Sequence, residues 1–428
     1  MHETLVNLGL HLVLVGNLLV FLGVPHLPFA LLGIVNLATF AGFCYAARLF
    51  TTSIVSIPFI ALQLQIKLVS VIISYAARGF KPAFPEWTFI FEITISMMRY
   101  VFERFSEAIV NENTALVRAP IKRYGEKILD STCRQYGTIP EKLFVNEMEH
   151  LWLRDPHKKQ LHIVVLHFHG GGYCMSDPLM NLELGNQTHA MLKQIFKDKH
   201  QLEVSVDVLL VRYRMAPERV YPTALNDCFA MYKHVLKHEN VLPTHVVLSG
   251  DSAGAEMSIS TCMRLREGNS QLQPGVVLCY SPVVDFSDVK SGESAPYCLL
   301  VDTFLQQCIP LYLRNVKDLN DVSPINHSLQ DLPPFFLQWG SLERFYEQGL
   351  RFKAKAEAEG VTKMEFDFLP NMVHDVVMFP WEVCPSAEKG LRNGCEFAAK
   401  NLAPVLRGAS PCNVNLVLEF PTKATPFA

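Results

Sequence analysis

The stretch Gly250-Asp251-Ser252-Ala253-Gly254 decides the fold of this chain. It follows an apolar, strand-like run at residues 246–248 and precedes a helix-like run at residues 255–266. The pattern therefore predicts a strand, a sharp turn and a helix, with Ser252 at the tip of the turn. The glycines two residues to either side remove side chains that would collide in so tight a bend. Because a bare G-x-S-x-G pattern is common, its meaning depends on partners elsewhere in the chain.

A base is the first partner that such a serine needs, because a hydroxyl is a poor nucleophile until its proton is taken. Only two histidines follow Ser252, namely His327 and His374. His327 lies in a polar segment typical of a loop, whereas His374 lies in a turn just after the apolar run 366–369. The sequence therefore favours His374 as the base.

An acid must then orient the imidazole ring. Glu343 follows the strand-like run 334–339 within a loop, which gives the order Ser, acid, His along the chain. Two competitors remain open. Glu347, one helical turn later, is expected to be solvated, and Asp375 adjoins the base and is badly placed to reach the far ring nitrogen. We predict Glu343 as the acid.

A glycine-rich turn supplies the third partner. The motif HGGG at residues 169–172 follows soon after the apolar run 163–166. Acyl transfer builds an oxyanion, and the backbone N–H groups of such a turn can surround it where side chains would obstruct. The predicted donors are the amides of Gly170, Gly171, Gly172 and Ala253, with the last three as the principal ones.

Together these pieces resemble the hormone-sensitive-lipase family of α/β-hydrolases. The resemblance rests on HGGG, Tyr213–Glu218, GDSAG at residues 250–254, the loop 340–349 and His374, and it covers about residues 160–380. It implies an α/β-hydrolase fold and a serine ester hydrolase. It also implies that Tyr213–Glu218 supports the sheet, with a buried Glu218 paired to Arg214. The family usually has aspartate where this chain has Glu343, but other α/β-hydrolases use glutamate there.

Alternating strand and helix patterns extend this fold over residues 161–404, the predicted catalytic domain. Such alternation predicts a mostly parallel sheet with helices on both faces. Residues 81–160 are expected to form a helical cap or linker, which an apolar, helix-like segment at 297–313 completes within an insertion at about 290–330. Residues 405–428 read as a tail.

The N-terminus reads as a membrane anchor region over residues 1–80. No Lys, Arg, Asp or Glu lies between Glu3 and Arg48, a stretch of 44 residues, whereas about 20 suffice to cross a bilayer. This stretch is too long, and its start too poor in basic residues, for a cleaved signal peptide. Two spans are predicted at Leu5–Val24 and Phe29–Ala47. A third apolar run, Ile54–Tyr75, either crosses the membrane or lies in its interface.

Composition excludes several other classes of function. The net charge is −3, and neither a basic patch nor a phosphate-cradling motif stands out, so nucleic acid is not a predicted partner. Eleven cysteines are scattered without a C-x-x-C pair or a His/Cys cluster at metal-ligand spacing. No metal and no cofactor is predicted.

The layout as a whole is similar to fungal steryl acetyl hydrolases and to membrane-anchored arylacetamide-deacetylase-like esterases. This similarity implies a lipophilic acetate ester, such as an acetylated sterol, as substrate. It also implies the endoplasmic reticulum membrane as location, with a lumenal catalytic domain. Basic residues follow the first predicted spans at Arg48, Arg78 and Lys81, and the positive-inside bias would keep that flank in the cytosol. Two glycosylation sequons, at Asn186 and Asn326, permit a lumenal domain.

Three alternatives stay open at this point. A long-chain neutral-lipid or steryl ester lipase would use the same triad on a different acyl group. A non-catalytic ligand-binding protein on the same fold, as in the plant gibberellin receptor, would lack a working triad. A membrane tether would only bind partners, although no repeat, low-complexity arm or coiled coil favours it.

Overall fold

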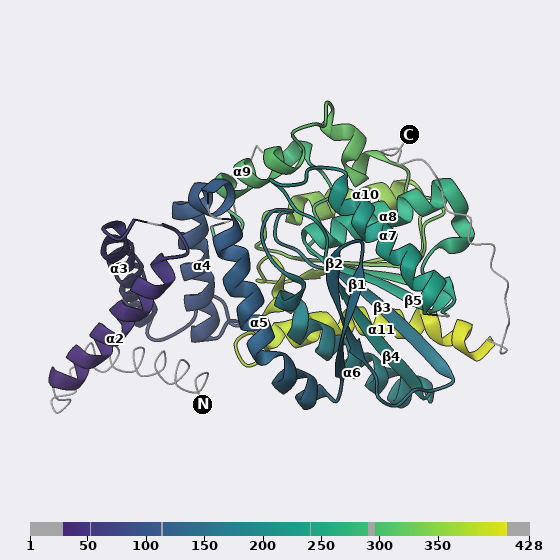
Figure 1. Ribbon diagram of the computed structural model, residues 1–428, viewed down its shortest axis with the longest axis horizontal. Helices are drawn as coiled ribbons and strands as arrows, with labels where there is room; N and C mark the ends of the chain where they lie inside the picture. Colours follow the sequence, from purple (N-terminus) through teal and green to yellow (C-terminus); the bar gives the residue numbers. More distant parts are fainter. Residues whose placement is uncertain (1–28, 52, 113, 240, 290–295, 409–428) are drawn as a thin grey trace. The chain divides into compact units, whose positions relative to one another are not determined.

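A computed structural model describes residues 29–51, 53–112, 114–239, 241–289 and 296–408 (Figure 1). The chain divides into two compact units between Leu116 and Val117. The predicted span Leu5–Val24 and most of the predicted tail lie outside the described residues.

The N-terminal unit is helical. It contains α2 (Phe29–Ala47), α3 (Ser56–Ala77), α4 (Phe89–Glu107) and a short π-helical turn, η1 (Ala108–Glu112). Buried residues of α3 such as Leu68 and Ile72 cluster with Ile93 of α4. The bounds of α2 coincide with the second predicted span. Among the described helices, α3 is long and apolar enough to cross a membrane, judged by length and composition alone.

The second unit begins in α5 (Thr114–Tyr136) and is built on one eight-stranded sheet with the order β1-β2-β4-β3-β5-β6-β7-β8. The strands are β1 (Ile139–Val145), β2 (Met148–Arg154), β3 (Leu161–Phe168), β4 (Val204–Val211), β5 (Val246–Asp251), β6 (Val276–Tyr280), β7 (Phe335–Gly340) and β8 (Met364–Leu369). The last six strands pair in parallel, whereas β1 and β2 pair antiparallel with their neighbours. The predicted fold class, a mostly parallel sheet, is confirmed.

Helices cover both faces of this sheet. The helices of this unit after α5 are α6 (Leu182–His200), α7 (Thr223–His238), α8 (Ala253–Asn269), α9 (Asp302–Tyr312), α10 (Tyr346–Ala358) and α11 (Pro385–Gly408). Figure 1 shows α7, α8 and α10 on one side of the sheet and α6 and α11 on the other. Short 3₁₀ turns are η2 (Pro178–Asn181), η3 (Pro243–His245), η4 (Ser270–Leu272), η5 (Ser287–Val289), η6 (Leu319–Val322), η7 (Pro324–Asn326) and η8 (Val376–Met378).

The structure differs from the prediction at residues 139–154, which were expected within a helical cap or linker. They form the hairpin β1–β2, whose turn residues Asn146 and Glu147 have φ of 50° and 63°. Because β1 is an edge strand with proline and two charged residues, its side chains are partly or fully exposed and its sequence lacks a buried apolar face.

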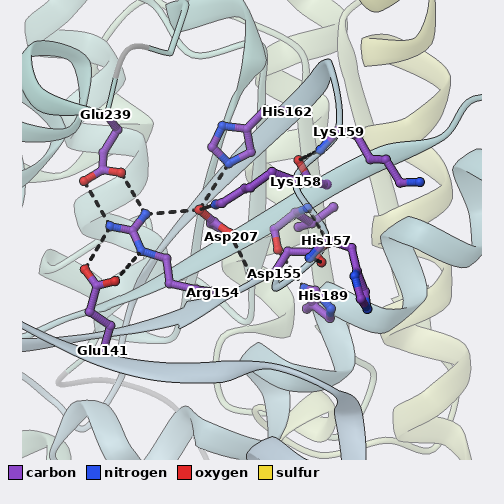
Figure 2. A network of polar contacts seen from close by, with 12 residues as sticks. Glu141, Arg154, Asp155, His157, Lys158, Lys159, His162, His189, Asp207 and Glu239 are labelled. Carbon is purple, nitrogen blue, oxygen red and sulfur yellow. Dashed lines mark hydrogen bonds and ion pairs between the residues drawn. The ribbon is translucent and has the colours of Figure 1, made fainter.

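An ion-pair network fixes this edge of the sheet (Figure 2). The Arg154 guanidinium contacts Glu239 at 2.7 Å and Asp207 at 3.1 Å, and His162 and Lys158 also contact the fully buried Asp207 carboxylate. Burial alone would raise the pKa of Asp207, but hydrogen bonds, led by that from His162, hold it well below the usual value. The network lies near the start of the parallel strands β3 and β4, away from the ends where the predicted site residues lie.

Candidate active site

Ser252 occupies the strained turn that its motif predicts. It directly follows β5, and its φ of 48° and ψ of −115° lie in a region that side chains rarely adopt. A Cβ on Gly250 would lie 2.3 Å from the carbonyl carbon of Gly254, and a Cβ on Gly254 would lie 1.8 Å from the Phe168 oxygen. Only glycine fits at either position. The turn therefore presents the Ser252 hydroxyl at the carboxyl end of the sheet.

The structure brings the three predicted triad residues together. The Oγ of Ser252 lies 2.9 Å from Nε2 of His374, and Nδ1 of His374 lies 3.4 Å from Oε1 of Glu343. All three side chains are buried, and the Phe345 ring packs edge-on against the imidazole at 5.4 Å. Nδ1 therefore faces the orienting acid and Nε2 faces the serine, which are the positions that a general base requires.

A serine that the sequence analysis did not single out fixes the acid. Ser281 Oγ donates to Glu343 Oε2 at 2.7 Å, and the Gly340 amide donates to the same oxygen at 2.9 Å. The same hydroxyl accepts the Asp375 amide at 3.0 Å. Ser281 directly follows β6, and this position beside the ends of β5 and β7 was the available signal.

Gly171 and Gly172 are placed as oxyanion donors. Their φ values of 108° and 58° favour glycine, and a Cβ on Gly171 would lie 1.8 Å from the Met175 oxygen. Within the described part of the chain, neither amide donates a hydrogen bond. Ala253 is the first residue of α8, so its amide has no partner within the helix. These three amides are therefore available to an oxyanion, and their role as its donors stays a prediction.

The prediction of the Gly170 amide as an oxyanion donor is wrong. Its amide donates to Asp251 Oδ2 at 2.9 Å and is therefore unavailable to an oxyanion. The other carboxylate oxygen of Asp251 contacts Asn181 Nδ2 at 2.7 Å and His167 Nε2 at 3.0 Å. Asp251, which directly precedes the nucleophile, thus braces the glycine turn against β5. Sequence reasoning missed this role, because the partners lie 70 to 84 residues away.

The segment Tyr213–Glu218 also supports the glycine turn, but not through the predicted ion pair. Tyr213 Oη donates to the His169 oxygen at 2.6 Å, and the two rings stack at 4.2 Å. The side chain of Glu218 is 57% exposed and pairs with Arg118 at 3.0 Å. Arg214 pairs instead with Asp227 at 2.6 Å. The predicted buried pair of Arg214 and Glu218 is therefore wrong.

The rival site residues lie elsewhere or play other parts. His327 Nε2 contacts the Asp321 oxygen at 3.1 Å, in the loop around η7. Glu347 is exposed in the first turn of α10. Asp375 does reach the imidazole, because its Oδ2 lies 3.2 Å from Nε2 of His374. Asp375 thus contacts Nε2, the nitrogen that faces Ser252, whereas Glu343 contacts Nδ1.

A small, mostly apolar cavity adjoins the nucleophile. Its volume is about 20 Å³, and its apolar wall comes from Val283, Leu300, Phe304, Leu305, Ile309 and Phe345. Three of these residues belong to α9, which lies within the predicted cap insertion. Tyr173, which also lines the cavity, stacks on Tyr312 of α9 at 3.9 Å. Helix α9 thus forms much of the cavity wall.

None of the cysteines among the described residues belongs to the triad. All ten in the described residues are free, and nine of them are buried. Burial raises the pKa of several of these thiols, that of Cys384 to about 11. They behave as small core residues.

The chain is similar in sequence to known ester hydrolases. A family model described as the alpha/beta hydrolase fold matches residues 165–378. An esterase of Acinetobacter venetianus is 30% identical over 243 residues, which are 55% of this chain and 74% of that protein. An acetyl-hydrolase of Streptomyces hygroscopicus is 29% identical over 214 residues, covering 49% of this chain and 67% of that protein.

Solved structures agree on the fold. An esterase from the bacterial hormone-sensitive lipase family has a TM-score of 0.58 and 24% identity, covering 74% of this chain and 99% of that one. A hormone-sensitive lipase from a metagenome library also has a TM-score of 0.58, with 23% identity, 72% of this chain and 97% of that one. The chain therefore belongs to the α/β-hydrolase family and is a carboxylic ester hydrolase.

Proposed function

We propose that this protein is a membrane-associated serine esterase that removes short acyl groups, acetyl first, from bulky apolar alcohols such as sterols. Ser252 is the nucleophile, His374 the general base and Glu343 the orienting acid. The observation that carries the proposal is the 2.9 Å contact between Ser252 Oγ and His374 Nε2 at the mouth of a small apolar cavity.

The chemistry follows from these positions. Nε2 of His374 takes the Ser252 proton as Oγ attacks the acyl carbon, and the amides of Gly171, Gly172 and Ala253 stabilise the oxyanion. Nε2 then returns the proton to the departing alcohol, which leaves an acyl-enzyme. Water, activated by the same nitrogen, hydrolyses this intermediate.

The size of the cavity argues for a short acyl group. Its volume of about 20 Å³ is enough for about one water-sized group, since a water needs roughly 10–15 Å³ by this measure. The methyl of an acetyl group is of that size. Each further methylene that cannot be accommodated costs about 1–3 kcal/mol in discrimination. An apolar wall also suits a methyl better than a polar group.

We expect hydrolysis of cholesteryl acetate to exceed that of cholesteryl palmitate by at least about 100-fold, measured as kcat/KM in mixed micelles. Phe304→Ala should lower this acetate-to-palmitate ratio of kcat/KM, because the Phe304 ring forms part of the cavity wall and its loss leaves room for a longer acyl chain. Phe144→Ala is the matched control, since Phe144 is 69% exposed on β1. Equal or greater activity of the unaltered protein on the palmitate would favour the alternative, a long-chain steryl ester or neutral-lipid lipase.

Exposed apolar side chains in the N-terminal unit support membrane association. Eight of them lie on α2, α3 and the turn between these helices: Leu37, Tyr45, Ile54, Val55, Phe59, Leu62, Ile66 and Ile73. Patches of this kind are rare on soluble surfaces and mark contact with lipid or protein. Lys67 of α3 lies 6.0 Å from the Tyr100 ring of α4, so this charged side chain is directed towards α4. The exposed apolar side chains remain available to lipid.

We place the catalytic domain in the lumen of the endoplasmic reticulum, and glycosylation tests this. Asn326 is exposed, whereas Asn186 is fully buried in α6 and bonded to Thr138 at 2.5 Å and to the Leu182 oxygen at 2.9 Å. We therefore expect the membrane-bound protein to carry one glycan, removable by endoglycosidase.

Removal of the glycan by endoglycosidase should shift the electrophoretic mobility of the protein. Asn326→Gln should abolish this shift, and Asn186→Gln should leave it unchanged. The same membranes, washed with carbonate, should retain the protein. An unglycosylated protein whose catalytic domain is digested by protease in sealed microsomes would place that domain in the cytosol.

A further inference from the structure

One nitrogen of the catalytic imidazole has two partners. Nε2 of His374 lies 2.9 Å from Ser252 Oγ and 3.2 Å from Oδ2 of Asp375. The position of Asp375 is fixed, because its amide donates to Ser281 Oγ at 3.0 Å and its backbone is left-handed with φ of 53°. Its second oxygen, Oδ1, is buried without a hydrogen-bond partner in the described part of the chain. Among the described residues, only the His374 side chain contacts this carboxyl group.

This contact requires a proton. A general base must offer the Nε2 lone pair to the serine hydroxyl, and an ionised carboxylate facing that lone pair is repelled by it. A separation of 3.2 Å is favourable only when the proton lies on Nε2, as an imidazolium, or on Asp375, as a carboxylic acid. The lone pair is unavailable to Ser252 in both forms.

Other charged and titratable groups face this pair from several elements. Glu343 approaches from the loop after β7, Asp251 from the end of β5, and the Cys298 thiol from the segment before α9. Burial lowers the pKa of His374, but Asp375 and Glu343 together outweigh it and hold that pKa well above the usual value. Burial raises the pKa of Asp375 to about 7. The two groups therefore titrate as a pair.

We propose that Asp375 and His374 share one proton, and that the loss of this proton switches the esterase on as the pH rises. The proton passes to solvent. The ionised Asp375 side chain, already 16% exposed, then turns towards water, and the Nε2 lone pair accepts the Ser252 proton. Asp375 acts through His374 and thereby sets the acid limb of the pH profile. This inference rests on the proposed role of His374 as the base.

The pH dependence of inactivation by a fluorophosphonate tests it, because only a serine activated by a neutral base reacts quickly. Asp375→Gly removes the carboxyl group, and glycine tolerates the left-handed backbone. We expect the midpoint of its acid limb to fall by at least about one pH unit, which is a tenfold change in the proton affinity of the base. Asp375→Asn, which has no carboxyl proton to share, should shift the midpoint in the same direction.

Asn371→Gly is the matched control, because Asn371 has φ of 57° in the same turn and carries no charge. Its midpoint should stay at the wild-type value. Midpoints of both Asp375 variants equal to the wild type would overturn the inference, as would folded variants that react at no pH. A wild-type protein that reacts at no pH would instead contradict the proposed function, so the two failures are distinguishable.

Discussion

Ser252→Ala is expected to lower ester hydrolysis by about 10⁴- to 10⁶-fold and to abolish labelling by a fluorophosphonate probe. The variant keeps the backbone of the turn, because alanine and serine meet the same constraint at φ of 48°. The amides of Gly171, Gly172 and Ala253 remain, so a small residual activity from the oxyanion site is expected. Turnover of an acetate ester and gel-based labelling measure the two effects.

Ser258→Ala is the control for this variant. Ser258 is also buried and lies on α8, but its hydroxyl donates to the Gly254 oxygen at 2.9 Å and not to the imidazole. Its loss should leave labelling intact. Near-normal hydrolysis by Ser252→Ala would remove Ser252 as the nucleophile. A wild-type protein that binds apolar esters without being labelled would revive the binding-only interpretation.

The parts of this site that the sequence predicts are those set by local patterns. The turn around Ser252 requires two glycines at fixed spacing, and the glycine turn after β3 follows an unbroken apolar run. The proximity of Glu343 and His374 follows from topology, because parallel neighbours β7 and β8 end at the same edge of the sheet. Strand order and motif order together therefore place all three side chains.

The parts that the sequence did not predict depend on single long-range contacts. Whether the Gly170 amide is free depends on Asp251, 81 residues later. Whether Glu218 is buried depends on Arg118, 100 residues earlier. Neither pairing leaves a periodicity or a spacing in the sequence. The edge strand β1 was missed for a different reason, because its largely exposed side chains give no apolar alternation to detect.

Glu343→Gln should lower turnover by about 10⁴-fold, because three donors converge on this carboxylate. The Gly340 amide and the Ser281 hydroxyl donate to Oε2, and the Nδ1 proton of His374 is directed at Oε1. A glutamine has one acceptor oxygen in place of two. If that oxygen stays with Gly340 and Ser281, the amide NH₂ faces Nδ1. The imidazole then carries its proton on Nε2, and the serine has no base. If the amide turns round, its NH₂ opposes two donors in a buried site, where unpaired polar groups cost about 1–3 kcal/mol each.

Glu347→Gln separates this effect from a general loss of charge near the site. Glu347 lies four residues later and is exposed in the first turn of α10, so its neutral variant should retain near-normal turnover. Steady-state hydrolysis of an acetate ester by both variants, with circular dichroism to verify folding, decides the matter. A loss confined to Glu347→Gln would make Glu347 the acid. If both variants kept full activity, the His374 tautomer would need neither carboxylate, and the 3.4 Å contact of Nδ1 with Glu343 would be structural only.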